Sequence, residues 1–167
     1  MGQTELKGFN INMNAEPDNF RLNLNWDNHD KIKNRGDIVA RGTFVKEPGI
    51  LTNPVLHIDI DSTSIYNKNN RWKIDQSKIL VDSNAVDINR LFISSKDNYY
   101  QVNGKVSKDP SDTLHFEFRG IDISPLNSVS KKKKEPDEIS LDLKGILEGN
   151  ILLTSLYKNP LVESNLK

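Results

Sequence analysis

Apolar and polar residues alternate with a period of two in four stretches of this chain. A period of two places alternate side chains on the same face of a β-strand, so each stretch predicts a strand with one apolar face. The apolar residues of these stretches are Phe20, Leu22, Leu24 and Trp26; Leu56, Ile58 and Ile60; Leu114, Phe116 and Phe118; and Leu141 and Leu143. We expect these twelve side chains to lie on one face of a sheet.

Shorter segments with the same character predict further strands. They are Asp37–Val45, Arg71–Asp75, Lys78–Val81, Ala85–Ile88, Arg90–Ser94, Tyr99–Val106, Asn150–Thr154 and Leu161–Leu166. The connectors are too short for helical crossovers and are rich in turn residues, which predicts an antiparallel meander. About eleven or twelve strands make a wide sheet, and a sheet of that width usually curls, splits or closes.

One region breaks this pattern. Ser124 followed by Pro125 predicts a helix cap and one short turn of helix. Residues 128–138, which include the basic run Lys131–Lys134, are interpreted as an exposed loop within a single β domain spanning 1–167. The four lysines are compatible with contact to anionic lipid or nucleic acid, but the acidic residues after them favour a solvated loop. We therefore predict an all-β fold with at most one short helix.

Composition agrees with strands and turns. The chain has three alanines, 20 asparagines, 16 isoleucines and nine valines, a balance that disfavours helix. Its 23 basic and 23 acidic residues argue against a dedicated nucleic-acid binder, and the absence of cysteine excludes disulfides and thiolate metal sites. No apolar run is long enough to span a bilayer, and the start does not resemble a signal peptide. We expect either a cytoplasmic protein or a piece of a longer exported chain.

Candidate chemistry is sparse. His57, Asp59 and Asp61 share a predicted strand face, but neighbours on such a face are about 7 Å apart, which is wide for ligands of one ion. A polar, solvent-facing strand is the preferred interpretation, and the same holds for His115 with its neighbours Glu117 and Arg119. Gly145 and Gly149 are interpreted as marking a turn or bulge between two strands. No catalytic motif is present, so we expect neither enzymatic activity nor a cofactor or metal.

The apolar sheet face has three interpretations at this point. It could be the dry core of a sandwich or closed barrel, or it could line the groove of a curved sheet that holds a lipid chain or an unfolded strand. A lipocalin-type barrel is the third, although the strands are too short and too many for eight regular staves.

Several segments resemble the repeat-bearing region of TamB-like proteins, which belong to the translocation and assembly module family related to AsmA. The segments that carry the resemblance are Leu22–Asn28, Trp72–Ile79, Ile88–Ile93, Tyr100–Ser107, Asp109–Leu114, Gly120–Asn127, Leu143–Asn150 and Leu156–Ser164. Their order and spacing cover most of the chain.

The resemblance implies a β-taco, which is an elongated, curled sheet with an apolar concave interior. It implies a periplasmic segment of a protein that an N-terminal helix, missing here, anchors in the inner membrane of a Gram-negative envelope. The expected role is outer-membrane biogenesis, with phospholipid or other acyl chains as cargo, or assistance to outer-membrane protein assembly beside an Omp85-class barrel. The alternative remains a β-sandwich binding or scaffold domain with a dry core and no cargo.

Overall fold

The computed structural model describes residues 7–46, 54–68, 70–124 and 144–167. Within these residues the chain forms strands only, with no α-helix. The strands are β1 (Asn10–Glu16), β2 (Asn19–Asp27), β3 (Arg35–Val45), β4 (Val55–Ile60), β5 (Thr63–Asn67), β6 (Asn70–Ile74), β7 (Ser77–Val81), β8 (Ala85–Ser95), β9 (Asn98–Ser107), β10 (Thr113–Asp122), β11 (Ile146–Thr154) and β12 (Leu161–Leu166).

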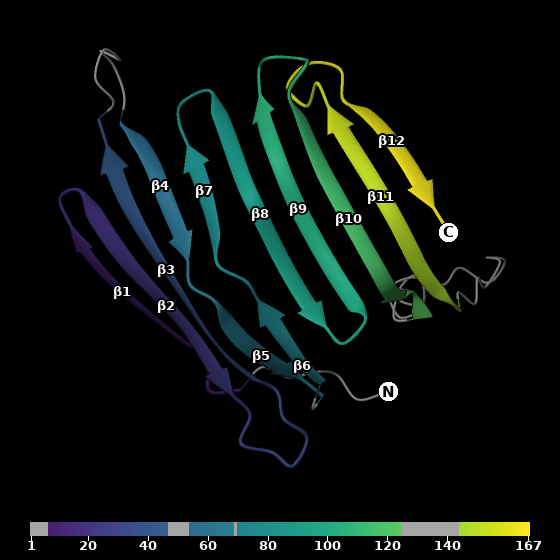
Figure 1. Ribbon diagram of the computed structural model, residues 1–167. Helices are drawn as coiled ribbons and strands as arrows, with labels where there is room; N and C mark the ends of the chain where they lie inside the picture. The colour runs from purple at the N-terminus through teal and green to yellow at the C-terminus, as the bar shows by residue number, and fades with distance from the viewer. Residues whose placement is uncertain (1–6, 47–53, 69, 125–143) are drawn as a thin grey trace, which may run out of the picture.

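All twelve strands belong to one antiparallel sheet (Figure 1). The main path runs β1-β2-β3-β4-β7-β8-β9-β10-β11-β12, so neighbours in the sheet are near neighbours in sequence. Most connectors are too short for the long crossover that a parallel pair would require. The predicted all-β, antiparallel meander is confirmed, and the sheet curls partially into a ring.

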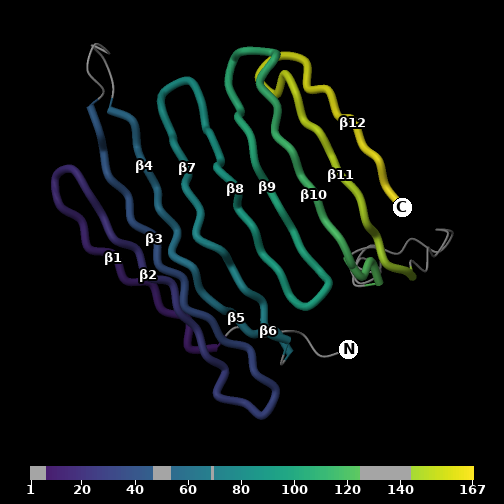
Figure 2. Tube along the Cα trace, in the orientation of Figure 1, coloured from purple at the N-terminus to yellow at the C-terminus, as the bar shows by residue number. Residues whose placement is uncertain are grey.

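The hairpin β5–β6 lies below β4 and β7 and continues them (Figure 2). Ile60 pairs with Ser77, and Thr63 pairs with Ile74. Between these pairs, residues 61–62 and residues 75–76 do not pair with each other, so both segments are interrupted at the same level of the sheet. Paired irregularities of this kind bend both strands together. The bend is well packed: Ile74 and Ser77 are 5% and 2% exposed, and the Ser77 hydroxyl donates a hydrogen bond to the Asn89 carbonyl.

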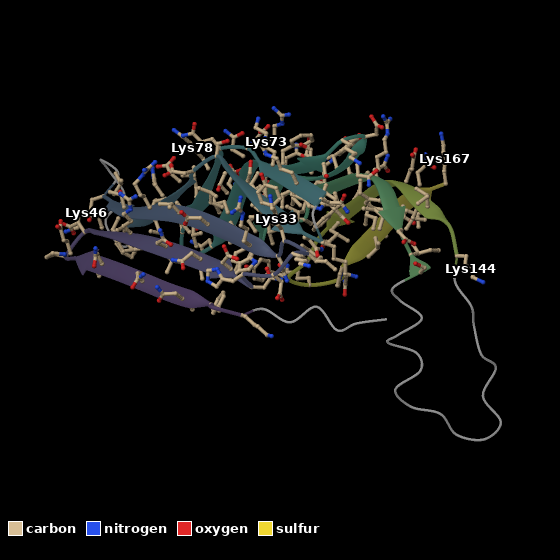
Figure 3. All side chains as sticks on the ribbon, turned by 90° about the horizontal axis from the view of Figure 1, so that it is seen from below. Lys33, Lys46, Lys73, Lys78, Lys144 and Lys167 are labelled. Carbon is tan, nitrogen blue, oxygen red and sulfur yellow. The ribbon has the colours of Figure 1, made fainter. Side chains whose placement is uncertain are left out.

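The sheet is a single layer, and the described residues contain no second sheet that could complete a sandwich. Only three of their apolar side chains are buried, those of Ile74, Ala85 and Leu114. Viewed along the sheet, the strands form an arch with Lys73 and Lys78 on its outer side (Figure 3). The pairing registers place these lysines opposite Ser94 and Asn89, on the face that does not carry the apolar positions, so the apolar face is the concave one.

Some predicted segments differ from the observed strands. Ala85–Ile88 and Arg90–Ser94 are not two strands; they form the single strand β8, interrupted by a bulge at which Arg90 has φ +48°. The polar pair Asn89-Arg90 made the bulge look like a turn in the sequence. β1 and β5 were missed altogether.

Two predictions about loops and glycines have different outcomes. Gly145 directly precedes β11, and Gly149 lies within β11, paired with Phe118, next to the bulge at which the pairing of β10 and β11 shifts register. The predicted strand ending at Lys144, the helical turn after Ser124 and the loop at 128–138 fall on residues 125–143, outside the described residues.

Candidate binding surface on the concave face

One row of cross-strand partners crosses the whole sheet on its concave face. Each member pairs directly with the next through the antiparallel registers. In order from β1 to β12 the row is Ala15, Phe20, Gly42, Ile58, Ile79, Ile88, Gly104, Leu114, Leu153 and Val162. No member has a polar side chain, so an uninterrupted apolar strip spans ten strands.

The predicted face residues fall on this same face wherever the structure describes them. Three of them belong to the row itself: Phe20, Ile58 and Leu114. The registers place seven more beside it: Leu22, Leu24, Trp26, Leu56, Ile60, Phe116 and Phe118. The remaining two, Leu141 and Leu143, lie outside the described residues. Whether these side chains line a groove that binds a ligand stays a prediction.

The concave face carries no charge at any strand position that the described registers pair. Charged side chains on the strands point to the convex face, where for example Lys78 lies between Asp59 and Asn89. Arg41 and Asp61 make an ion pair there, with the Arg41 Nη1 atom 3.0 Å from Asp61 Oδ2. Because burial of an unpaired charge is costly whereas apolar burial is favourable, a charge-free concave face suits an apolar occupant.

Aromatic rings on the concave face pack over glycines of the neighbouring strand. Phe20 lies over Gly42, and Trp26 lies over Gly36, so that a Cβ atom at either glycine would overlap the ring. The Trp26 indole N–H donates a hydrogen bond of 3.2 Å to the Asn34 side-chain oxygen. Neither glycine can therefore be replaced by a larger residue while the ring keeps its position.

A second aromatic contact crosses a whole strand. The rings of Trp72, on β6, and Tyr100, on β9, have centroids 5.6 Å apart, although β8 lies between their strands. Ser95 of β8 is 8% exposed, and its small side chain leaves room for this contact. Tyr100 is 41% exposed, so part of its side chain lies open on the concave face.

The convex face holds a different cluster around Tyr99. The Tyr99 hydroxyl donates a hydrogen bond of 2.5 Å to Glu117, which raises the Tyr99 pKa above its ordinary value. Arg119 lies 5.6 Å from the Tyr99 ring centroid and 4.0 Å from Glu148, beside a cavity of about 170 Å³. The cluster places the basic Arg119 beside the acidic Glu148, a contact typical of cross-strand pairing on an exposed sheet.

The part of the chain that the structure describes contains neither a candidate metal site nor a candidate membrane-spanning helix. It has no group of three or more histidine and acidic side chains that could hold a metal ion. Of the residues His57, Asp59 and Asp61 considered above as metal ligands, Asp61 accepts a hydrogen bond from the Arg41 guanidinium. None of the described segments forms a helix of the length and apolarity needed to cross a bilayer.

Sequence reasoning missed several residues of the concave face. Ile11 and Met13 alternate with asparagines in β1, and this alternation was a usable signal. Ile79, Ile88 and Leu153 sit in strands that were predicted, but their face was not assigned. Trp72 and Tyr100 carried no period-two signal, because β6 is short and the pair Tyr99-Tyr100 has one ring on each face.

Comparison of the chain with models of protein families, with curated protein sequences and with solved structures gives no match.

Proposed function

We propose that this chain is a periplasmic segment of a TamB-like envelope-biogenesis protein, and that its concave face carries phospholipid acyl chains between the inner and outer membranes. The observation that supports this is the uncharged strip from Ala15 to Val162, which crosses ten strands on the concave side of a single-layer sheet. A dry sandwich core would be covered by a second layer. Here the described residues supply no cover.

The energetics of such a surface suit passage of a chain. Each methylene that leaves water for the concave face contributes about 0.8 kcal/mol, without any directional contact. Neighbouring positions on the strip are all apolar, so an acyl chain that moves by one position loses little binding free energy. Weak, repeated contacts of this kind permit binding and onward movement together.

The resemblance of the sequence to TamB-like proteins supplies the cellular setting of this proposal: the periplasm, an inner-membrane anchor outside this segment, and an Omp85-class partner in the outer membrane. Five of the resembling segments contribute a member of the strip, namely Ile79, Ile88, Gly104, Leu114 and Val162, and a sixth contributes Leu22 beside it.

The test measures phospholipid retained by the purified chain. Native mass spectrometry of protein prepared without detergent should detect bound phospholipid, and Phe116→Asp should lose it, because the carboxylate enters the apolar face. His115→Asp is the matched control, since it places the same charge on the convex side of the same strand. A wild-type chain without lipid, or equal retention by both variants, would contradict the proposal.

A second pair of variants controls for the possibility that Phe116→Asp loses lipid because it misfolds. Ile11 is 56% exposed on the edge strand β1, so Ile11→Asp should leave the fold intact, which circular dichroism can verify. Asn12→Asp is its control on the opposite face. Loss of lipid by Ile11→Asp alone would again support the concave face as the binding surface.

A second candidate function, support of outer-membrane protein assembly, is favoured by one observation. The edge strands β1 and β12 each pair on one side only within the described residues, and neither contains proline or lysine. Such edges can accept an incoming strand through main-chain hydrogen bonds. This candidate predicts capture of an extended peptide that added lipid does not displace.

A further inference from the structure

The concave face differs between its two ends. At the end that holds the β2–β3 loop it carries side chains that contain N–H or O–H groups: Trp26, Thr63, Trp72, Ser95, Asn98 and Tyr100. The donors of Trp26 and Thr63 are bonded to Asn34 and to the Asp37 carbonyl, and Ser95 is buried, so Trp72, Asn98 and Tyr100 are the donors through which this end can meet a ligand. These residues form the amphipathic end. Toward the opposite end, six residues before Trp26 in β2, Phe20 belongs to the strip, in which no side chain has such a group.

The residues of the amphipathic end are linked across the sheet. Trp26 lies over Gly36, and Ile65, the partner of Trp72, also borders Gly36. Trp72 contacts Tyr100, and Asn98 pairs with Ser95 and reaches Gly120. Both tryptophans of the chain and its one concave-face tyrosine therefore lie in one transverse band.

We propose that this difference orients a bound phospholipid, with its ester and headgroup region at the amphipathic end and its acyl chains extending parallel to the strands, so that their methyl ends reach the strip. The inference rests on the proposed function and adds a direction to it. Indole and phenol rings have an apolar body and a polar tip, and they favour places where an apolar region meets a wet one. The strip offers only apolar surface, so it favours methylenes over esters.

Geometry supports a graded surface of useful length. Six residues of an antiparallel strand span about 20 Å, which separates Trp26 from Phe20. The Tyr100 side chain is open to a ligand at one end of this distance, since the residue is 41% exposed. At the other end the Phe20 ring lies over Gly42 and offers only carbon atoms.

Quenching of tryptophan fluorescence by lipids that carry a nitroxide at a known position measures this orientation, because both native tryptophans lie in the band. The probe is phosphatidylcholine with a nitroxide either near the ester or near the methyl end of one acyl chain. Trp26→Phe leaves Trp72 as the single fluorophore, at the amphipathic end. The triple variant Trp26→Phe, Trp72→Phe, Phe20→Trp moves the single fluorophore to the strip.

The ester-proximal nitroxide should quench the Trp72 fluorophore more strongly, and the methyl-end nitroxide should quench the fluorophore of the triple variant more strongly. The same order of quenching in both proteins, or no dependence on nitroxide position, would overturn the proposed orientation while lipid binding stands. Absence of quenching by either lipid would overturn the proposed function, and the orientation with it.

A second measurement does not depend on moving a fluorophore. Tyr100→Phe should weaken phosphatidylcholine binding by about fivefold, the equivalent of one hydrogen bond of about 1 kcal/mol. Tyr99→Phe, the adjacent residue on the convex face, should leave the affinity unchanged. Equal effects of the two variants would contradict a polar contact at Tyr100.

Discussion

The indole ring of Trp26 covers Gly36, its cross-strand partner on β3, and fills the space in which any larger side chain would stand. Ile65 borders the same space from β5, with its Cγ2 atom 2.8 Å from the position of an added Cβ. The pair thus joins β2, β3 and the lower hairpin at one point of the concave face.

Gly36→Ala should destabilise the fold, because its methyl group overlaps the indole ring. We expect the free energy of unfolding, measured in urea, to fall by about 1–3 kcal/mol, the usual cost of overpacking. In a Trp26→Leu background the same substitution should cost less, since the ring is gone. A strictly additive double-mutant cycle would show that the two residues do not compete for this space.

Leu114 should be the most sensitive leucine of the sheet. It is 8% exposed and lies in the strip between Gly104 and Leu153, so truncation removes packed apolar surface. Leu114→Ala should lower the free energy of unfolding by about 2–5 kcal/mol. Leu80→Ala, at a convex position that is 38% exposed, is the control and should cost clearly less. Equal losses would mean that the strip is no better packed than the convex surface.

Tyr99 should ionise at higher pH than an ordinary tyrosine. Its hydroxyl donates to Glu117, and this hydrogen bond is the main reason that the pKa is raised, with desolvation next. The stabilisation is therefore fully present below the tyrosine pKa of the unfolded chain, and it is lost as pH rises through the raised folded-state pKa. Absorbance of tyrosinate during titration measures this.

Two variants isolate the Tyr99 titration. Tyr99→Phe should remove the highest-pH component of the absorbance change. Glu117→Gln should move that component to lower pH, because the carboxylate acceptor and its charge are both lost. A titration curve that Glu117→Gln leaves unaltered would refute the role of this hydrogen bond.

Alternation along the chain was enough to predict the sheet, because a one-layer meander leaves each strand with one wet face. Phe20–Trp26 illustrates this: the predicted face is the observed one. The bulge in β8 was not predictable in the same way. Asn89 and Arg90 break the alternation as a turn would, and only the pairing of both halves with β9 identifies one strand.

The concave band was only partly predictable for a related reason. Trp72 and Tyr100 meet across β8, and no spacing within either strand encodes a contact between strands that are not neighbours. The bend at Ile60 and Thr63 brings the lower hairpin to β8, and it depends on two interruptions at the same level of the sheet. Whether two interruptions lie at the same level depends on how the strands pair, and the local sequence pattern of each strand does not contain that information.

The edge strand β1 should promote self-association of the purified chain. Ile11 and Met13 are 56% and 59% exposed, and the outer side of β1 has no partner strand within the described residues. An inward-pointing lysine is a common device against edge pairing, so Met13→Lys should reduce concentration-dependent association in sedimentation velocity. Asn23→Lys adds the same charge on the convex face of β2, away from the edge, and should reduce association less. If both lysines act alike, net charge and not the open edge governs association of this sheet.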